Sequence, residues 1–220
     1  FMDHTPGQGQ FREVAAFRNF LRKSYGHTDA AIDRVMAHRR DHANGAGERI
    51  ERIAAAGRAA AVPLASHDDD DPGRIAALAA LGVTVSEFPV TLEAARTAVG
   101  HGLTTMFGAP NIVRGASQSG AIRAAEAVAA SVAHCLCSDY APAALLPAVF
   151  KLVESGALPL PAAAALVTAA PARAVGLTDR GVLAPGRRAD LIAVRASPLG
   201  PQVTRSWVAG REAYRVVAAA

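Results

Sequence analysis

The chain alternates short apolar runs with helical patterns, and this alternation limits its fold more than any other feature. Runs at 62–65, 83–86, 103–107 and 134–137 predict strands, and each is followed by a stretch with helical spacing of apolar residues. The loops between them are short, which is typical of parallel strands joined by crossover helices. We therefore expect an α/β fold: a parallel sheet with helices outside it.

Further helices are expected before and after these repeats. Residues 11–23 have helical spacing, Thr28 is a candidate N-cap for the next helix, and helical character continues to about residue 61 with a break at 44–47. Two separate helices and one long interrupted helix both fit. Residues 159–175 predict an Ala-rich helical stretch, and counting Phe1 and Met2 as the end of a strand gives five parallel strands.

Five short polar motifs stand at the ends of the expected strands. They are Phe1–Pro6, Ser66–Asp71, Glu87–Pro89, Gly108–Asn111 and Ser138–Tyr140. In an α/β barrel the carboxyl ends of the strands converge on one mouth, where metals and substrates bind. Histidine and carboxylate side chains recur at these ends, so a metal-dependent hydrolase is the first hypothesis.

The composition excludes several other classes of protein. The 220 residues are 51% hydrophobic, but charges interrupt every apolar run before the roughly 20 residues that a membrane helix needs. No signal peptide pattern opens the sequence, so we expect a cytoplasmic protein with no membrane partner. The net charge of +4 comes with only two lysines and few aromatic residues, which does not indicate a nucleic-acid partner.

The two cysteines, Cys135 and Cys137, are one residue apart. On a strand their side chains point to opposite faces, which disfavours a mutual disulfide. We expect both to be small core residues. A Cys-x-Cys metal pair remains the alternative, although no second cluster in the sequence completes it.

After Gly176 the sequence becomes β-rich. Short β-like runs at 182–183, 190–195, 203–208 and 213–217 are separated by proline and glycine residues. We expect two domains, 1–177 and 178–220. The tail pattern from Gly181 to Val194, followed by a second run to Val208, resembles the return of amidohydrolase-superfamily chains into their small β-sandwich.

The resemblance extends to the strand-end motifs. Met2–Phe11, Ser66–Asp69, Glu87–Pro89, Gly108–Gly115 and Ser138–Tyr140 are similar to the diphosphatases of phosphonate metabolism within that superfamily. This resemblance implies the C-terminal strands and helices of a distorted (β/α)8 TIM-like barrel, strands four to eight, followed by a β-sandwich segment. Three departures accompany it: Gln118 stands where histidine is expected, the aspartate run is longer, and the superfamily's His-x-His pair is absent from the chain.

The activity implied by the resemblance is a metal-dependent hydrolysis in the carbon–phosphorus lyase pathway. Its substrate is a phosphorylated ribose phosphonate, alpha-D-ribose 1-methylphosphonate 5-triphosphate, which is split into the 5-phosphate and pyrophosphate. The cofactor is one or two divalent metal ions, with zinc preferred. Another amidohydrolase reaction, either cyclic amide hydrolysis or deamination, is the alternative, as is an inactive fragment or scaffold subunit. A homo-oligomer is left open.

Four residues are the expected metal ligands. The resemblance implies that Asp139, after the last parallel strand, binds metal and accepts the proton of the attacking water. His67 follows an apolar strand and precedes carboxylates, which suits a metal-bound imidazole. His4 and Glu87 complete the set. The alternatives are helix capping for Asp139, a capping loop for His67, a buried core role for His4 and bonds to backbone amides for Glu87.

The remaining candidates surround this set. Asn111, Arg114, Ser117 and Ser119 flank Gly115 and Gly120 before a helix, and with Tyr140 they are the expected substrate-binding residues. The Gly-Lys-Ser/Thr ending of a P-loop is missing. Asp68 and Asp69 are expected behind the metal ligands, where they would orient His67. Asp70 is expected in solvent, and Asp71 before Pro72 as a helix N-cap.

Overall fold

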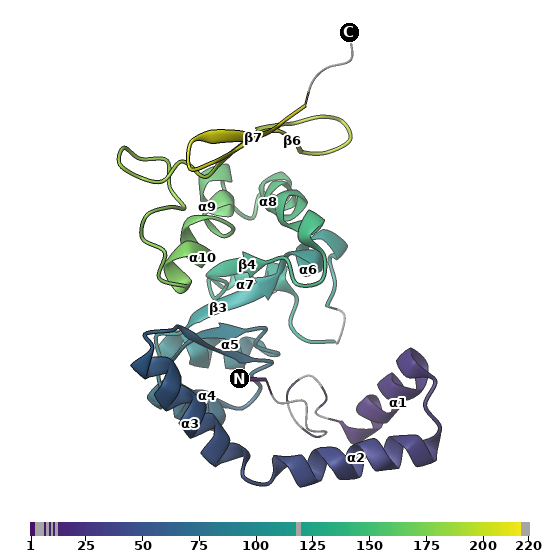
Figure 1. Ribbon diagram of the computed structural model, residues 1–220. Helices are drawn as coiled ribbons and strands as arrows, with labels where there is room; N and C mark the ends of the chain where they lie inside the picture. Colours follow the sequence, from purple (N-terminus) through teal and green to yellow (C-terminus); the bar gives the residue numbers. More distant parts are fainter. Residues whose placement is uncertain (3–6, 8, 10, 12, 118–119, 217–220) are drawn as a thin grey trace. The chain divides into compact units, whose positions relative to one another are not determined.

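A four-stranded sheet and a separate three-stranded sheet organise the part of the chain that the structure describes (Figure 1). The structure is a computed structural model of residues 1–220, and it describes all of them except 3–6, 8, 10, 12, 118–119 and 217–220. The chain divides into two compact units. One comprises Phe1–Met106 with Gln118–Ile122, and the other comprises Phe107–Ser117 with Arg123–Ala220.

The larger sheet contains the strands that the alternation predicts. They are β1 (Leu64–His67), β2 (Val83–Glu87), β3 (Thr104–Gly108) and β4 (Cys135–Cys137), in the order β1-β2-β3-β4. β1 pairs with β2 and β2 with β3, both in parallel. The expected α/β class is therefore confirmed. Residues 1 and 2 form no strand of their own, which corrects the count of five, although the N–H of His67 donates to the carbonyl of Phe1 at 3.0 Å.

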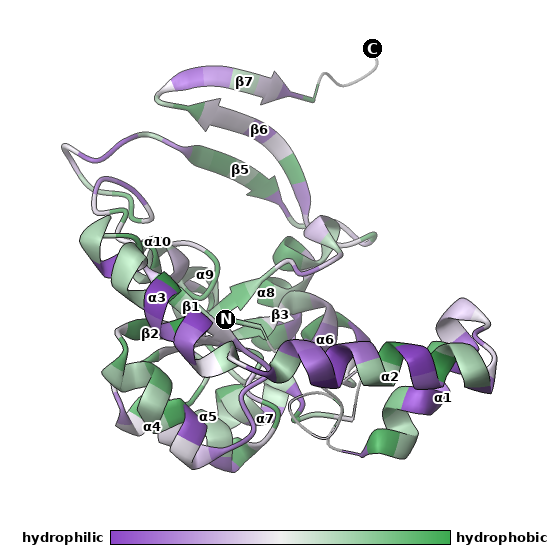
Figure 2. Ribbon diagram, turned by 60° about the horizontal axis from the view of Figure 1, so that its bottom comes forward, coloured by the Kyte–Doolittle hydropathy of each residue, from purple (hydrophilic) through white to green (hydrophobic). Residues whose placement is uncertain are grey.

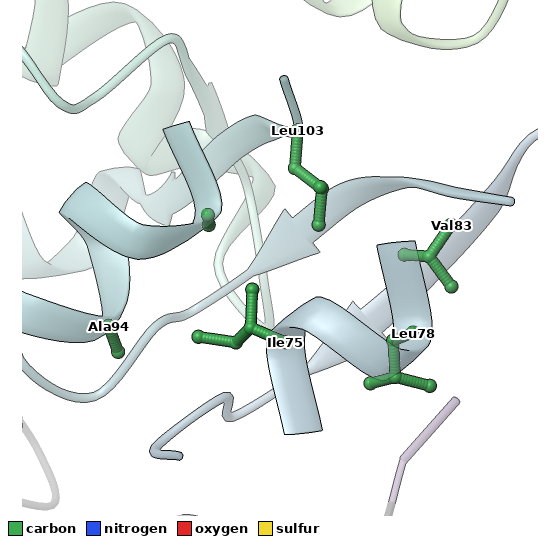
Figure 3. Close-up of a cluster of buried hydrophobic side chains, with 6 residues drawn as sticks. Ile75, Leu78, Val83, Ala94 and Leu103 are labelled. Atoms are coloured by element: carbon green, nitrogen blue, oxygen red, sulfur yellow. The ribbon is translucent and has the colours of Figure 1, made fainter. Parts of the chain in front are cut away.

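Two helices of the first unit pack on this sheet through a small apolar core. α4 (Pro72–Ala80) and α5 (Leu92–Gly100) contribute Ile75, Leu78 and Ala94 to a buried cluster with Val83 of β2 and with Leu103 (Figure 3). Each large side chain buried here stabilises the fold by roughly 1.5–3 kcal/mol. The start of α4 is set by Asp71, whose carboxylate accepts the N–H of Arg74 at 2.7 Å, which confirms the predicted N-cap.

Three helices precede the sheet in the same unit. They are α1 (Val14–Tyr25), α2 (Asp29–Ala43) and α3 (Ala46–Ala59), so the predicted break at 44–47 separates two distinct helices. Thr28 caps α2, as expected, by accepting the N–H of Ala31. α1 and α2 share a core of their own, formed by Phe17, Leu21, Ile32 and Met36. No helix among the described residues is long and apolar enough to cross a membrane.

Six helical segments lie in the described part of the second unit. They are α6 (Ala109–Arg114), α7 (Ala124–Ala129), the 3-10 turn η1 (Pro142–Ala144), α8 (Leu145–Glu154), α9 (Leu160–Ala165) and α10 (Ala169–Ala174). The helical stretch predicted over 159–175 forms as two separate helices, α9 and α10. Between these two helices, the carbonyl of Leu166 accepts the N–H of Leu136 in β4 at 2.8 Å. The helical stretch is interrupted where this carbonyl bonds to the strand.

The tail forms the three-stranded antiparallel sheet of β5 (Leu191–Arg195), β6 (Gln202–Val208) and β7 (Arg211–Arg215). Figure 2 shows β5 as largely hydrophobic and β7 as largely hydrophilic. The strand predicted at 182–183 does not form. The predicted domain boundary after residue 177 stays a prediction.

The turn between β6 and β7 has two residues in the left-handed region. Ala209 has φ 50° and Gly210 has φ 79°, as a two-residue hairpin turn requires. Asp190 holds this turn: its carboxylate accepts the N–H of Ala209 at 2.8 Å, and Arg188 and Arg180 also donate to it. The hydrogen bond from Ala209, then that from Arg188 and the charges of Arg188 and Arg180, hold the pKa of Asp190 below its ordinary value. A residue with a Cβ is thus kept in a conformation that favours asparagine or glycine.

We predict that Ala209→Asn stabilises the small sheet by roughly 0.5–1 kcal/mol, because asparagine tolerates the left-handed region better than alanine. Trp207 in β6 is the only tryptophan of the chain, so its fluorescence during urea unfolding measures the effect. Ala213→Asn, in the extended backbone of β7, is the matched control and should not stabilise. A lower unfolding midpoint for Ala209→Asn contradicts the prediction.

Candidate active site

Two strand-end side chains meet at the carboxyl ends of β1 and β2. His67 and Glu87 are register partners, each the last residue of its strand. A carboxylate can only accept, so Nδ1 of His67 carries a proton and donates it to Oε2 of Glu87 at 2.7 Å. The side chain of His67 is 17% exposed. In the neutral ring, this bond fixes the tautomer and makes Nε2 the nitrogen with a lone pair.

Asp68 lies on the other side of the imidazole. Its backbone has φ 54°, and its Oδ2 is 3.6 Å from Nε2 of His67. Two ligands of one tetrahedral zinc ion, each about 2.1 Å from the metal, are roughly 3.4 Å apart. The spacing of these two atoms therefore fits a shared divalent cation, with a nitrogen and an oxygen donor of the kind that zinc accepts.

Asp69 links the ends of β1 and β2 through hydrogen bonds to its carboxylate. It is 1% exposed, and its Oδ2 accepts the hydroxyls of Ser66 at 2.5 Å and of Ser86. Its backbone carbonyl accepts the N–H of Val90 at 2.9 Å. The other oxygen, Oδ1, is buried and has no hydrogen-bond partner among the described residues. A buried carboxylate oxygen of this kind is energetically costly unless a cation or a solvent molecule compensates it.

The environment of His67 raises its pKa above the ordinary value of 6.5. Burial lowers the pKa, but the hydrogen bond to Glu87 and the negative charges of Asp68 and Glu87 together outweigh it. The folded, metal-free chain therefore keeps the imidazolium form to a higher pH than an unperturbed histidine does. Its contribution to stability is complete below pH 6.5 and is lost as the pH rises through the raised pKa of His67.

The structure does not assemble the full set of expected metal ligands. Within the described ranges, no three His, Cys, Asp or Glu side chains form a metal-binding group. His4 lies outside the described residues. Glu87 binds the imidazole of His67, a position from which it can orient this ring. The ligand roles of His4, His67, Glu87 and Asp139 stay predictions.

Asp139 follows β4 and has φ 48°. The carbonyl of Ser138 accepts the N–H of Ala141 at 2.9 Å, so Asp139 lies within a tight turn. Helix capping was the alternative for its carboxylate. The N-cap of η1 is Ala141, and no side chain caps this segment. Capping of η1 therefore does not account for the carboxylate.

The expected phosphate loop is partly a helix. Asn111 and Arg114 lie in α6, which ends at Arg114 and is capped by Gly115 with φ 76°, so the prediction of a loop before a helix is wrong for these two residues. Oδ1 of Asn111 accepts the N–H of Ala124 at 3.0 Å, at the start of α7. The sequence signal was weak because α6 has only six residues and contains a proline in its first turn.

Arg114 and Tyr140 come together in the second unit. NH1 of Arg114 donates to the hydroxyl of Tyr140 at 2.6 Å, and its Nε donates to the carbonyl of Ala116 at 3.2 Å. Both side chains are exposed. Ser117 follows α6, and Ser119 lies outside the described residues. The substrate-binding roles of these residues stay predictions, as does that of Asn111.

Other sequence expectations near the site have mixed outcomes. Asp70 is not simply solvated, because its Oδ2 accepts the N–H of Gly9 at 2.9 Å. Cys135 is buried and Cys137 is partly buried, and the two form no disulfide, as predicted. Sequence reasoning missed Ser66 and Ser86. The available signal was their common position, each directly before the last residue of its strand.

Comparison with known proteins identifies the family. A model of the amidohydrolase family matches residues 25–217, and the chain belongs to that family. It is 38% identical, over 97% of its length, to alpha-D-ribose 1-methylphosphonate 5-triphosphate diphosphatase of Escherichia coli (strain K12). The chain spans 57% of the length of that relative.

Solved structures support the same fold. An amidohydrolase from Thermotoga maritima MSB8 superposes with a TM-score of 0.58 and 18% identity, over 92% of this chain and 52% of that one. The A. niger ochratoxinase gives a TM-score of 0.57 and 20% identity, over 77% of this chain and 46% of that one. At this identity the likeness concerns the fold alone: part of a TIM-like barrel and a β-sandwich segment, as the sequence predicts.

We predict that Glu87→Gln lowers the pKa of His67 in the metal-free chain, because it removes a negative charge while burial remains. NMR titration of the imidazole measures the pKa in the parent chain, where it should exceed 6.5, and in the variant. Glu93→Gln, at an exposed position of α5, is the matched control and should leave the value unchanged. An identical pKa in the parent chain and in Glu87→Gln contradicts the assigned cause.

We also predict that Ser86→Ala lowers the free energy of unfolding by about 1–3 kcal/mol, because it removes a hydroxyl donor from a buried carboxylate. Urea unfolding followed by far-UV circular dichroism measures this loss. Ser24→Ala, at an exposed position of α1, is the matched control and should be neutral or slightly stabilising. Equal stability of Ser86→Ala and the parent chain would show that the hydrogen bond from Ser86 to Asp69 does not stabilise the fold.

Proposed function

We propose that this chain belongs to an enzyme that hydrolyses alpha-D-ribose 1-methylphosphonate 5-triphosphate to the 5-phosphate and pyrophosphate, in the carbon–phosphorus lyase pathway. The observation that carries the proposal is the 38% identity, over 97% of this chain, to a diphosphatase named for that substrate. Membership of the amidohydrolase family and the acidic, histidine-containing strand ends support a hydrolase.

The chain's residues fit a divalent cation at the end of β1. Nε2 of His67 and Oδ2 of Asp68 would hold it, since their 3.6 Å separation suits two ligands of one ion. When bound, the metal supplies a Lewis acid that polarises a phosphoryl oxygen and lowers the pKa of water. Glu87 holds the proton on Nδ1 and so keeps Nε2 basic. Zinc is the preferred metal for this nitrogen and oxygen donor set.

Asp139 is the proposed general base. Its carboxylate follows a parallel strand, at the kind of position where α/β barrels place catalytic groups. It would accept a proton from the water that attacks the triphosphate. Hydrolysis adds this water to a phosphorus atom and breaks one phosphoanhydride bond, so that pyrophosphate leaves. The proton balance therefore needs an acceptor, and a carboxylate supplies it.

Arg114 is the proposed phosphate-binding residue. Its guanidinium has five N–H donors, of which the bonds to Tyr140 and Ala116 use one each on NH1 and Nε. The remaining donors suit a bidentate contact with a phosphate. Tyr140 would set the orientation of the guanidinium. Ser117 and Asn111 are the further proposed substrate contacts, and Ser119 completes them on the sequence evidence.

We predict that pyrophosphate is released from the ribose 5-triphosphate when zinc or another divalent cation is supplied, and that Asp139→Asn lowers kcat by about 10²–10⁴-fold. The assay uses both the 220-residue chain and the longest reading frame that contains it. Asp41→Asn, on the exposed face of α2, is the matched control. Ammonia released from cyclic amides or bases, with no pyrophosphate from the triphosphate, overturns the proposal.

Metal content tests the assigned ligand separately. His67→Ala should reduce the zinc retained after dialysis, because it removes the imidazole, whereas His101→Ala at the exposed end of α5 should not. Elemental analysis of the purified chain measures both. Full zinc retention in His67→Ala shows that the ion is held elsewhere.

A further inference from the structure

Phe88 lies in the Glu87–Pro89 motif and has no role in the chemistry proposed above. Its backbone has φ 56°, in the left-handed region. Its ring lies against the imidazole of His67, with centroids 5.3 Å apart and an interplanar angle of 78°, an edge-to-face arrangement. Its N–H donates to the carbonyl of Met106 at 2.9 Å. Both ring and backbone are therefore held in place.

This backbone conformation is unfavourable for the residue that adopts it. A bulky side chain is a genuine outlier at positive φ, because its Cβ crowds the carbonyl oxygen. The proline that follows also pushes its predecessor toward extended conformations. Such conformations persist where the surrounding structure over-determines them, and they cluster at functional sites. The bond to Met106 and the fully buried Pro89 provide that restraint.

The left-handed turn allows two consecutive side chains to reach the same imidazole. On a regular strand, neighbouring residues point to opposite faces of the sheet, so Glu87 and Phe88 could not both contact His67. With φ 56° at Phe88, the carboxylate of Glu87 accepts the hydrogen bond from Nδ1 and the phenyl ring makes an edge-to-face contact with the imidazole. The hydrogen bond selects the tautomer only while Nδ1 faces Glu87, and the aromatic contact restricts the rotation that would turn the imidazole away from that carboxylate.

We propose that Phe88 is a positioning residue that locks the orientation of the His67 imidazole and so directs Nε2 toward Asp68. The inference rests on the proposed metal-binding role of His67. It adds a residue that touches neither metal nor substrate and acts through the histidine. The turn at Phe88 is kept, despite its strain, because it brings this ring to the imidazole.

The experiment compares Phe88→Tyr, Phe88→Leu and Phe88→Gly in the full chain. Nitrogen NMR of the metal-free protein, recorded at a pH above the raised pKa of His67 so that the ring is neutral, reports the tautomer of the imidazole, and calorimetric titration reports the affinity of the chain for zinc. Phe88→Tyr keeps the ring and should match the parent in both. Phe88→Leu should give a mixture of tautomers and a zinc affinity about tenfold lower. Phe20→Leu, in α1, is the matched control and should change neither.

Phe88→Gly separates positioning from folding. Glycine adopts positive φ without strain, so this variant should form the turn readily and still show mixed tautomers and weaker zinc binding. A single parent-like tautomer in Phe88→Leu, or in Phe88→Gly if the leucine variant does not fold, overturns the proposal. The tautomer is measured without metal or substrate, so this test can fail or succeed independently of the proposed diphosphatase activity.

Discussion

The buried carboxylate of Asp69 is the constraint on which the site in the first unit depends. It accepts hydroxyl groups from Ser66 on β1 and Ser86 on β2, so one side chain joins the ends of two neighbouring strands. The next residues along these strands are His67 and Glu87. Their 2.7 Å hydrogen bond requires the strand ends to be in register, and Asp69 holds that register from a position out of solvent.

Left-handed residues follow three of the four parallel strands. Asp68, Phe88 and Asp139 have φ values of 54°, 56° and 48°, directly after β1 and β2 and one residue later after β4. In each case the chain turns sharply where a regular strand would continue outward. Around His67, these turns bring Asp68 and Phe88 to the same ring as Glu87. More side chains therefore reach the imidazole of His67 than the alternating side-chain directions of regular strands would allow.

The sequence predicts the fold better than it predicts the site. Periodicity and caps such as Thr28 and Asp71 identify most helices and strands, because these signals are local. The interruption of the helical stretch over 159–175 is not visible in the sequence, because β4 hydrogen-bonds to the carbonyl of Leu166, a contact between segments far apart in the chain. The left-handed φ of Phe88 is equally invisible, because no residue type at that position signals it. The hydrogen bond from Ser86 to Asp69 depends on the register of β1 and β2, which cannot be read from the sequence.

The two outer strands of the small sheet differ in how they meet another strand. β7 carries Arg211, Glu212 and Arg215, and the last two form an ion pair at 2.7 Å. Charged edge strands resist the addition of further strands, whereas apolar edges accept them. The sequence of β5, Leu-Ile-Ala-Val-Arg, is apolar over its first four residues. Within the described residues, the charged side chains of β7 therefore disfavour the pairing of a further strand at that edge, whereas the apolar β5 favours it at the opposite edge.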